Sequence, residues 1–160
     1  MTGKRIALSF TVDAPMWGCA GGMVVRAATG GNFDLILYEG TTVKATFPVD
    51  SNTLHADAQS NWVDFSFPDV ALTVGNTYYI AVVPTTTALV RVYRYVTPAT
   101  GQLSAFAGSC RTAIWTDSAW GTPLATEMPF GYVGISAFDD GAGGGGGVGS
   151  RIAGGLVRVA

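Results

Sequence analysis

Charged residues are scarce in this chain, and their scarcity excludes one large class of partner. Asp, Glu, Lys and Arg make up 12% of the 160 residues. Lysine occurs only at Lys4 and Lys44, the arginines are scattered, and the formal net charge is -2. Proteins that bind nucleic-acid backbones concentrate Lys and Arg on one surface. We therefore expect no nucleic-acid partner.

Residue types that build metal centres and catalytic sites are also few. His55 is the single histidine and has no cysteine near it in the sequence, which argues against zinc and against a histidine-dependent triad. The two glutamates, Glu39 and Glu127, do not mark the paired carboxylates that glycoside hydrolysis needs. The glycine run after residue 140 lacks the Gly-Lys-Ser/Thr ending of a phosphate loop. We predict no catalytic residue, no metal and no cofactor, and hence a protein that is not an enzyme.

Long apolar runs are missing as well. No stretch approaches the roughly 18 residues of a membrane-spanning helix, so we expect no membrane partner. The apolar residues after Lys4 and Arg5 end at Asp13, too soon for a signal peptide, which predicts synthesis in a cytoplasm without export. Cysteine occurs twice. Cys19 and Cys110 either form a disulfide across a long loop or remain free thiols of a protein made in a reducing cytosol.

What the chain does have is alternation of apolar and polar residues with a period of two, without sustained helical spacing. We predict strands, spaced as in a sandwich, over residues 5–12, 23–27, 33–38, 42–48, 62–67, 77–83, 89–96, 111–116 and 130–138. Glu39-Gly40 predicts a tight hairpin turn. The fold class is therefore all-β, a jelly-roll-like antiparallel β-sandwich over residues 1–140. Proline lacks a backbone donor, and five prolines fall at predicted strand ends: Pro48, Pro68, Pro84, Pro98 and Pro129.

Residues 141–160 differ abruptly from the rest and form a glycine-rich C-terminal tail. Fixing residues 141–149 in one conformation costs on the order of 10–20 kcal/mol. Burial of the four apolar side chains that follow returns roughly 6–12 kcal/mol, so contacts with other chains are needed as well. We interpret the tail as an assembly element. Its expected contact residues are Gly143, Gly144, Gly145, Gly146, Gly147, Ile152, Leu156, Val157 and Val159.

Aromatic residues are the candidates for contact with a glycan or a protein partner. The four tryptophans are Trp17, Trp62, Trp115 and Trp120, and we expect at least two of them in the core. Trp62 alternates with Val63 and is the best candidate for exposure. Within residues 89–96, Arg91, Tyr93 and Tyr95 share one face of the predicted strand. This face is either an interface with a partner or a second, partly covered sheet face. The predicted contact residues are Trp62, Arg91, Tyr93, Tyr95 and Trp120.

Three segments carry a resemblance to known modules: Phe33-Asp-Leu-Ile-Leu-Tyr-Glu-Gly40, Trp62-Val-Asp-Phe-Ser-Phe-Pro68 and Leu72-Thr-Val-Gly-Asn-Thr-Tyr-Tyr-Ile-Ala-Val82. They are similar to strand motifs of jelly-roll modules in bacterial adhesins, carbohydrate-binding modules and virion proteins of tailed phages. The segment 114–120 and the Asp-Asp-Gly ending of the body resemble chain ends of phage structural proteins.

The resemblance and the tail together imply a non-enzymatic structural protein of a phage virion. We expect a capsid decoration, head-fibre or tail-associated subunit that assembles through its C-terminal tail with other virion subunits and as a homo-oligomer. The alternative is a carbohydrate-binding module or adhesin domain that recognises cell-surface glycans, with polar contacts from loop 49–61. The two functions are compatible, because a displayed virion domain can bind host glycans.

Overall fold

The computed structural model describes residues 5–27, 31–54, 60–85, 90–96 and 109–138. Within these ranges the chain is built almost entirely of strands, with one short 3-10 helix, η1 (Ser51–Thr53). The strands are β1 (Arg5–Phe10), β2 (Met16–Ala27), β3 (Phe33–Glu39), β4 (Thr42–Val49), β5 (Asn61–Leu72), β6 (Tyr78–Pro84), β7 (Val90–Val92), β8 (Arg94–Val96), β9 (Arg111–Thr116), β10 (Ala119–Trp120), β11 (Glu127–Pro129) and β12 (Gly131–Phe138).

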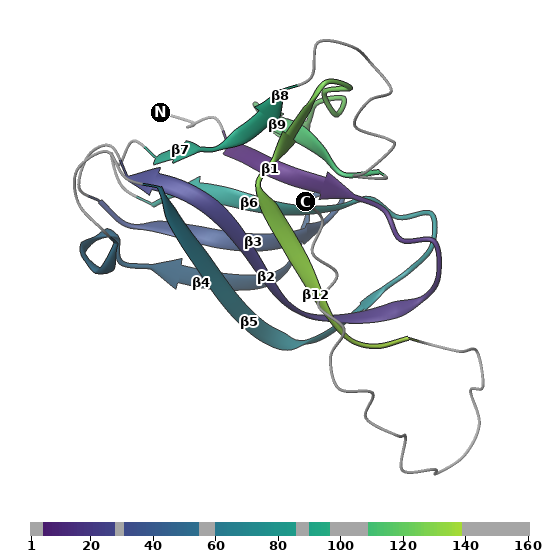
Figure 1. Cartoon of the computed structure of the whole chain (residues 1–160). Helices are drawn as coiled ribbons and strands as arrows, with labels where there is room; N and C mark the ends of the chain where they lie inside the picture. Colours follow the sequence, from purple (N-terminus) through teal and green to yellow (C-terminus); the bar gives the residue numbers. More distant parts are fainter. Residues whose placement is uncertain (1–4, 28–30, 55–59, 86–89, 97–108, 139–160) are drawn as a thin grey trace.

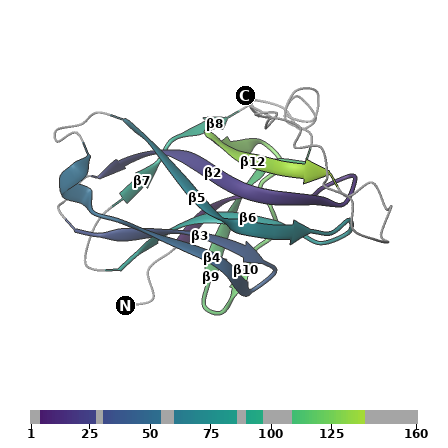
Figure 2. The ribbon, with the colours of Figure 1, turned by 90° about the horizontal axis from the view of Figure 1, so that it is seen from below.

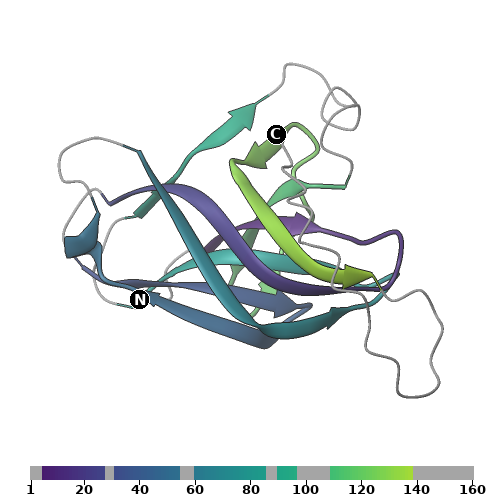
Figure 3. The ribbon, with the colours of Figure 1, turned by 60° about the horizontal axis from the view of Figure 1, so that its bottom comes forward.

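The strands form two packed sheets and one small ribbon, and every pairing between these strands is antiparallel. The six-stranded sheet has the order β10-β9-β1-β6-β3-β4. The four-stranded sheet has the order β12-β2-β5, with β7 also paired to β2, and the ribbon is β11-β8. Figure 2 shows the two larger sheets as separate layers, and in Figures 1 and 3 the strands β2, β5 and β12 cross obliquely over the other sheet. The predicted all-β antiparallel sandwich is confirmed.

The core lies between the two layers and follows from the alternation in the sequence. Phe33, Leu35 and Leu37 of β3 are fully buried and point inward, in line with the alternation of apolar and polar residues in this strand. They meet Met23 and Phe65 of the four-stranded sheet in one cluster of apolar side chains. Burying one such side chain contributes roughly 1.5–3 kcal/mol. The inward face of each sheet is therefore what holds the layers together.

The hairpin between β3 and β4 has the predicted turn at Gly40, whose φ of 56° lies in the left-handed region that suits glycine. A register shift between Leu37 and Tyr38 then changes which side chains of β4 face inward. Beyond the shift, Phe47 packs against the core. Val43, close to the turn, is instead paired with Tyr38 and half exposed.

Two strands extend at least five residues beyond their predicted bounds, and the pairing between them is irregular. β2 begins at Met16, seven residues before the predicted start. β5 continues through Pro68 to Leu72, so the expectation that this proline ends a strand is wrong. The pairing of β2 with β5 is irregular opposite Cys19, and Pro68 falls in that irregularity, where no ladder hydrogen bond is lost.

The other prolines fit the prediction better. Pro84 and Pro129 are the last residues of their strands, and Pro48 is the last but one of β4, an edge strand. The predicted strand 89–96 is broken at Tyr93: β7 joins the four-stranded sheet and β8 joins the ribbon. Pro98 and His55 lie outside the described residues.

The tryptophans correct one prediction, because none of the four belongs to the buried core between the sheets. Trp17 and Trp62 are 40% and 51% exposed. Trp115 and Trp120 are half-buried on the six-stranded sheet, where Trp120 packs against a second apolar cluster. This second cluster comes from the outward-facing residues of the sheet, such as Tyr38 and Tyr79.

Of the two alternatives for the cysteines, the structure has the free thiols. Cys110 is buried, Cys19 is partly buried, and the two are not bonded. The last described strand ends at Phe138, so the predicted assembly tail, residues 141–160, lies outside the described residues.

Candidate functional site

The five predicted contact residues are distributed over three sheets. Trp62 lies on β5, Arg91 on β7, and Tyr93 just after β7 with its amide bonded to the carbonyl of Val24. These three belong to the four-stranded sheet. The other two do not join them, since Tyr95 lies in the β8-β11 ribbon and Trp120 in the six-stranded sheet.

A compact aromatic site occupies the outer face of the four-stranded sheet. Trp62 and Asp64 come from β5, Tyr132 comes from β12, and β2 runs between them. The ring planes of Trp62 and Tyr132 are parallel within 1°, with centroids 5.8 Å apart. Asp64 Oδ1 accepts hydrogen bonds from Trp62 Nε1 at 2.5 Å and from the Tyr132 hydroxyl at 2.7 Å. We call Trp62, Asp64 and Tyr132 the Trp62 platform.

The platform exists because Gly22 lies beneath it. Gly22 is the β2 partner of both Tyr132 and Asp64, so the three residues form one row across the sheet. A Cβ atom at Gly22 would fall within 3.0 Å of the Tyr132 ring and 2.7 Å from Asp64 Oδ1. The missing side chain thus leaves the space in which the phenol and the carboxylate meet.

The electrostatics of the platform keep its hydrogen bonds in place. Burial, followed by the hydrogen bond to Asp64, raises the pKa of Tyr132 to about 12. The phenol therefore remains a donor throughout the physiological pH range. One carboxylate oxygen serves two ring donors, which leaves Asp64 Oδ2 to accept a hydrogen bond from outside. The platform presents half-exposed aromatic surface beside an anionic acceptor.

Trp120 belongs to a second aromatic cluster with a different character. Its ring stacks on Tyr79 at 4.5 Å and 9°, and the edge-to-face contact with Trp115 has a centroid distance of 5.1 Å. Arg5 lies 4.7 Å above the Trp115 ring and donates a hydrogen bond to the Tyr38 hydroxyl. The aromatic rings of this cluster pack against one another and against the sheet beneath them. We conclude that Trp120 covers the outer face of the six-stranded sheet.

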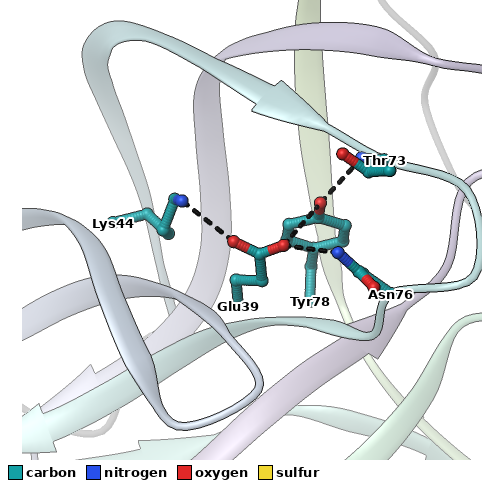
Figure 4. Close-up of polar contacts among 5 residues, drawn as sticks. All are labelled: Glu39, Lys44, Thr73, Asn76 and Tyr78. Atoms are coloured by element: carbon teal, nitrogen blue, oxygen red, sulfur yellow. Dashed lines mark hydrogen bonds and ion pairs between the residues drawn. The ribbon is translucent and has the colours of Figure 1, made fainter.

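Glu39 is the centre of a polar network that is structural (Figure 4). Its carboxylate pairs with Lys44 at 2.9 Å and accepts a hydrogen bond from Asn76 at 2.5 Å, and the Tyr78 hydroxyl lies 3.4 Å away. The hydrogen bond from Lys44 is the main reason why the pKa of Glu39 is lowered. Tyr78 in turn accepts from the Thr73 amide at 2.7 Å. The network joins the β3-β4 hairpin to the turn before β6.

A cavity of about 350 Å³ opens between the two sheets, where β1 faces β12. Its wall is largely apolar, with polar side chains from Thr11 and Asp13. Burial raises the pKa of the Cys110 thiol in this wall to about 11, so the thiol is protonated and unreactive at neutral pH. The cavity suits a small apolar group, but few polar groups converge there to orient a ligand.

Sequence reasoning found Trp62 and missed the residues that make it a site. Alternation places Asp64 on the same face of β5, but Tyr132 lies 70 positions away in the chain from Trp62 and is joined to it only by the β12-β2-β5 order. In addition, Gly22 falls in the part of β2 that was not predicted. Arg26, on the same face, was not singled out. Its neighbourhood depends on pairing between β2 and β7, for which the sequence has no local signal.

In the described part of the chain, no three His, Cys, Asp or Glu side chains gather in a group that could hold a metal ion. Among those same residues, none of the helical segments has the length and apolar character needed to cross a bilayer. Comparison of the whole chain with protein-family models, curated proteins and solved structures found no match.

Proposed function

We propose that this chain is a non-enzymatic binding domain that recognises glycans with the Trp62 platform. The observation that carries the proposal is a tryptophan with 51% of its surface exposed, held parallel to Tyr132 by a shared carboxylate. An exposed large aromatic ring that is fixed in orientation loses little entropy on binding. The C–H face of a sugar ring packs on such a surface, and its hydroxyl groups donate to a carboxylate oxygen.

The chemistry of the platform favours binding over catalysis. The platform has one carboxylate, Asp64, whereas most glycosidases use two that flank the bond to be broken. Asp64 is also engaged as the acceptor for two ring donors, which fixes both rings. A carboxylate that fixes the Trp62 and Tyr132 rings in this way is suited to accept hydrogen bonds from ligand hydroxyl groups.

Substitution of Trp62 by alanine tests the proposal. The full chain is expected to bind saturably to members of a glycan array, and Trp62→Ala is expected to weaken that binding by about 30-fold, the loss typical of a central aromatic contact. Trp17→Ala is the matched control, because Trp17 is also exposed on β2 but lies five residues from Gly22. Equal losses in both variants, or no binding anywhere on the array, would contradict the proposal.

The second part of the proposal places this binding domain on a phage particle as a capsid decoration, head-fibre or tail-associated subunit. It is supported by the composition of residues 141–160 and by the resemblance of the strand motifs to phage modules. On this proposal the protein is located in the virion, and its partners are other virion subunits and further copies of the chain. A domain that displays a glycan-binding face to solvent and assembles through a separate segment suits this role.

Deletion of residues 141–160 tests the assembly role. The shortened protein is expected to stay folded and to bind saccharides as before, because the Trp62 platform and the core belong to residues 5–138. It is expected to lose self-association, which light scattering after size-exclusion chromatography measures. Loss of folding, or an unchanged assembly state, would count against an assembly tail.

A further inference from the structure

We propose that the saccharide bound by the Trp62 platform is acidic, and that Arg26 and Arg91 bind its carboxylate or sulfate group. The inference rests on the proposed function and names its ligand class. Arg26 of β2 and Arg91 of β7 are direct cross-strand partners. Their neighbour Val25 is fully buried and Val92 packs against the core, so both arginines belong to the outer face of the sheet that carries Trp62.

The two arginines are not neutralised within the described residues. The ion pairs found there, Lys44–Glu39 and Arg94–Glu127, use neither of them. Arg26 Nε is buried and has no hydrogen-bond partner among the residues that the structure describes. Like charges directly opposite each other destabilise a sheet, and a buried donor without an acceptor adds to that cost. A bound anion reduces the repulsion between the two charges.

The position of the arginine pair relative to Trp62 sets the orientation of the ligand. Val24 is the cross-strand partner of Trp62, and Arg26 follows two residues later on the same face of β2, about 7 Å along the strand. Asp64, opposite Gly22, lies the same distance away in the other direction. The face is therefore positive at one end and negative at the other, with the exposed tryptophan ring between. A sugar stacked on Trp62 places its acidic substituent toward the arginines and hydroxyl groups toward Asp64.

The chemistry of the pair favours an oxyanion. The planar guanidinium fork donates two parallel hydrogen bonds to a carboxylate or a sulfate, and arginine keeps its charge in proteins. Uronic acids supply the carboxylate and sulfated sugars supply the sulfate. A neutral saccharide offers neither guanidinium group a charged acceptor.

Calorimetric titration of the full chain with three oligosaccharides tests the inference. The probes are an oligogalacturonate, a sulfated galactose oligosaccharide that carries no carboxylate, and a neutral galactose oligomer. We expect at least tenfold tighter binding to one acidic probe than to the neutral one, and the preferred probe tells carboxylate from sulfate. Arg91→Gln is expected to remove most of this preference, because it weakens acidic binding far more than neutral binding. Arg94→Gln is the matched control, because the Arg94 guanidinium pairs with Glu127 in the ribbon.

The outcomes separate this inference from the proposed function. Equal affinity for acidic and neutral probes would overturn the inference and leave glycan binding intact. An Arg91→Gln variant that loses neutral and acidic binding alike would overturn it too, since its effect would then not depend on the anion. Binding of no saccharide at all would overturn the proposed function itself. Circular dichroism of each variant shows that the fold is retained, as expected for an exposed side chain such as Arg91.

Discussion

Substitution of Gly22 by alanine is expected to abolish most saccharide binding while leaving the protein folded. A Cβ atom at this position would meet the Tyr132 ring and Asp64 Oδ1, and both are ends of side chains that can move away. When they move, the shared hydrogen bonds and the parallel rings are lost. We expect a loss of about 30-fold in affinity, as for removal of a central contact, although no contacting group has been deleted.

Gly134→Ala is the control for this experiment. Gly134 lies on the neighbouring strand β12, and a Cβ there would approach Ala20 without reaching the platform. Affinity is measured by titration calorimetry, and the free energy of unfolding by urea denaturation. If Gly22→Ala bound saccharide as well as the unchanged protein, the arrangement of Tyr132 and Asp64 would not be what the ligand recognises. A severe loss of stability would show that the two side chains cannot yield.

Replacement of Phe33 by alanine is expected to cause a large loss of stability. Phe33 is fully buried between the sheets, and its neighbours on the paired strands are Val49 and Pro84. Truncation removes the transfer free energy of the ring and leaves a cavity, which together cost about 3–5 kcal/mol. Such a loss is a large part of the stability of a typical domain. The unfolding midpoint in urea should fall accordingly, with little change in the slope of the transition.

The matched control for this prediction is Phe130→Ala. Phe130 is 40% exposed, so the same truncation removes less contact and is expected to cost about 1 kcal/mol or less. Similar losses for the two variants would contradict the inward orientation of β3. Such a result would also contradict the pairing register of β3, because a slip by one residue exchanges the two faces of a strand.

The sequence was most informative where a strand is buried on one face and ends in a turn with a specific residue. The alternation of Phe33, Leu35 and Leu37 and the turn at Gly40 predicted β3 and the hairpin to β4. It was least informative where strands bend. The bulge at Pro68 and the break at Tyr93 depend on pairing with β2 and β11, which local patterns do not contain.

The candidate site shows the same division. Exposure of Trp62 followed from its alternation with the buried residues of β5. Tyr132 lies beside Trp62, and Arg91 lies on the same sheet face, only because of the order of strands around β2. Strand order is not encoded in any short segment. Glycine is also ambiguous in a strand, because it weakens pairing and allows close approach alike. The role of Gly22, which leaves room for the Tyr132 ring and the Asp64 carboxylate, is visible only in the folded structure.

The most direct test of the Trp62 platform is to follow the four tryptophan indole N–H signals by NMR during titration of the full chain with the best-binding oligosaccharide. Trp62→Phe and Trp120→Phe variants assign the two decisive signals. The Trp62 Nε1–H group donates to Asp64 at the proposed binding face, so its signal should shift saturably, while the Trp120 signal from the opposite sheet stays in place. A Trp62 signal that is unmoved at saturation, with a shift at Trp120 instead, would contradict the account.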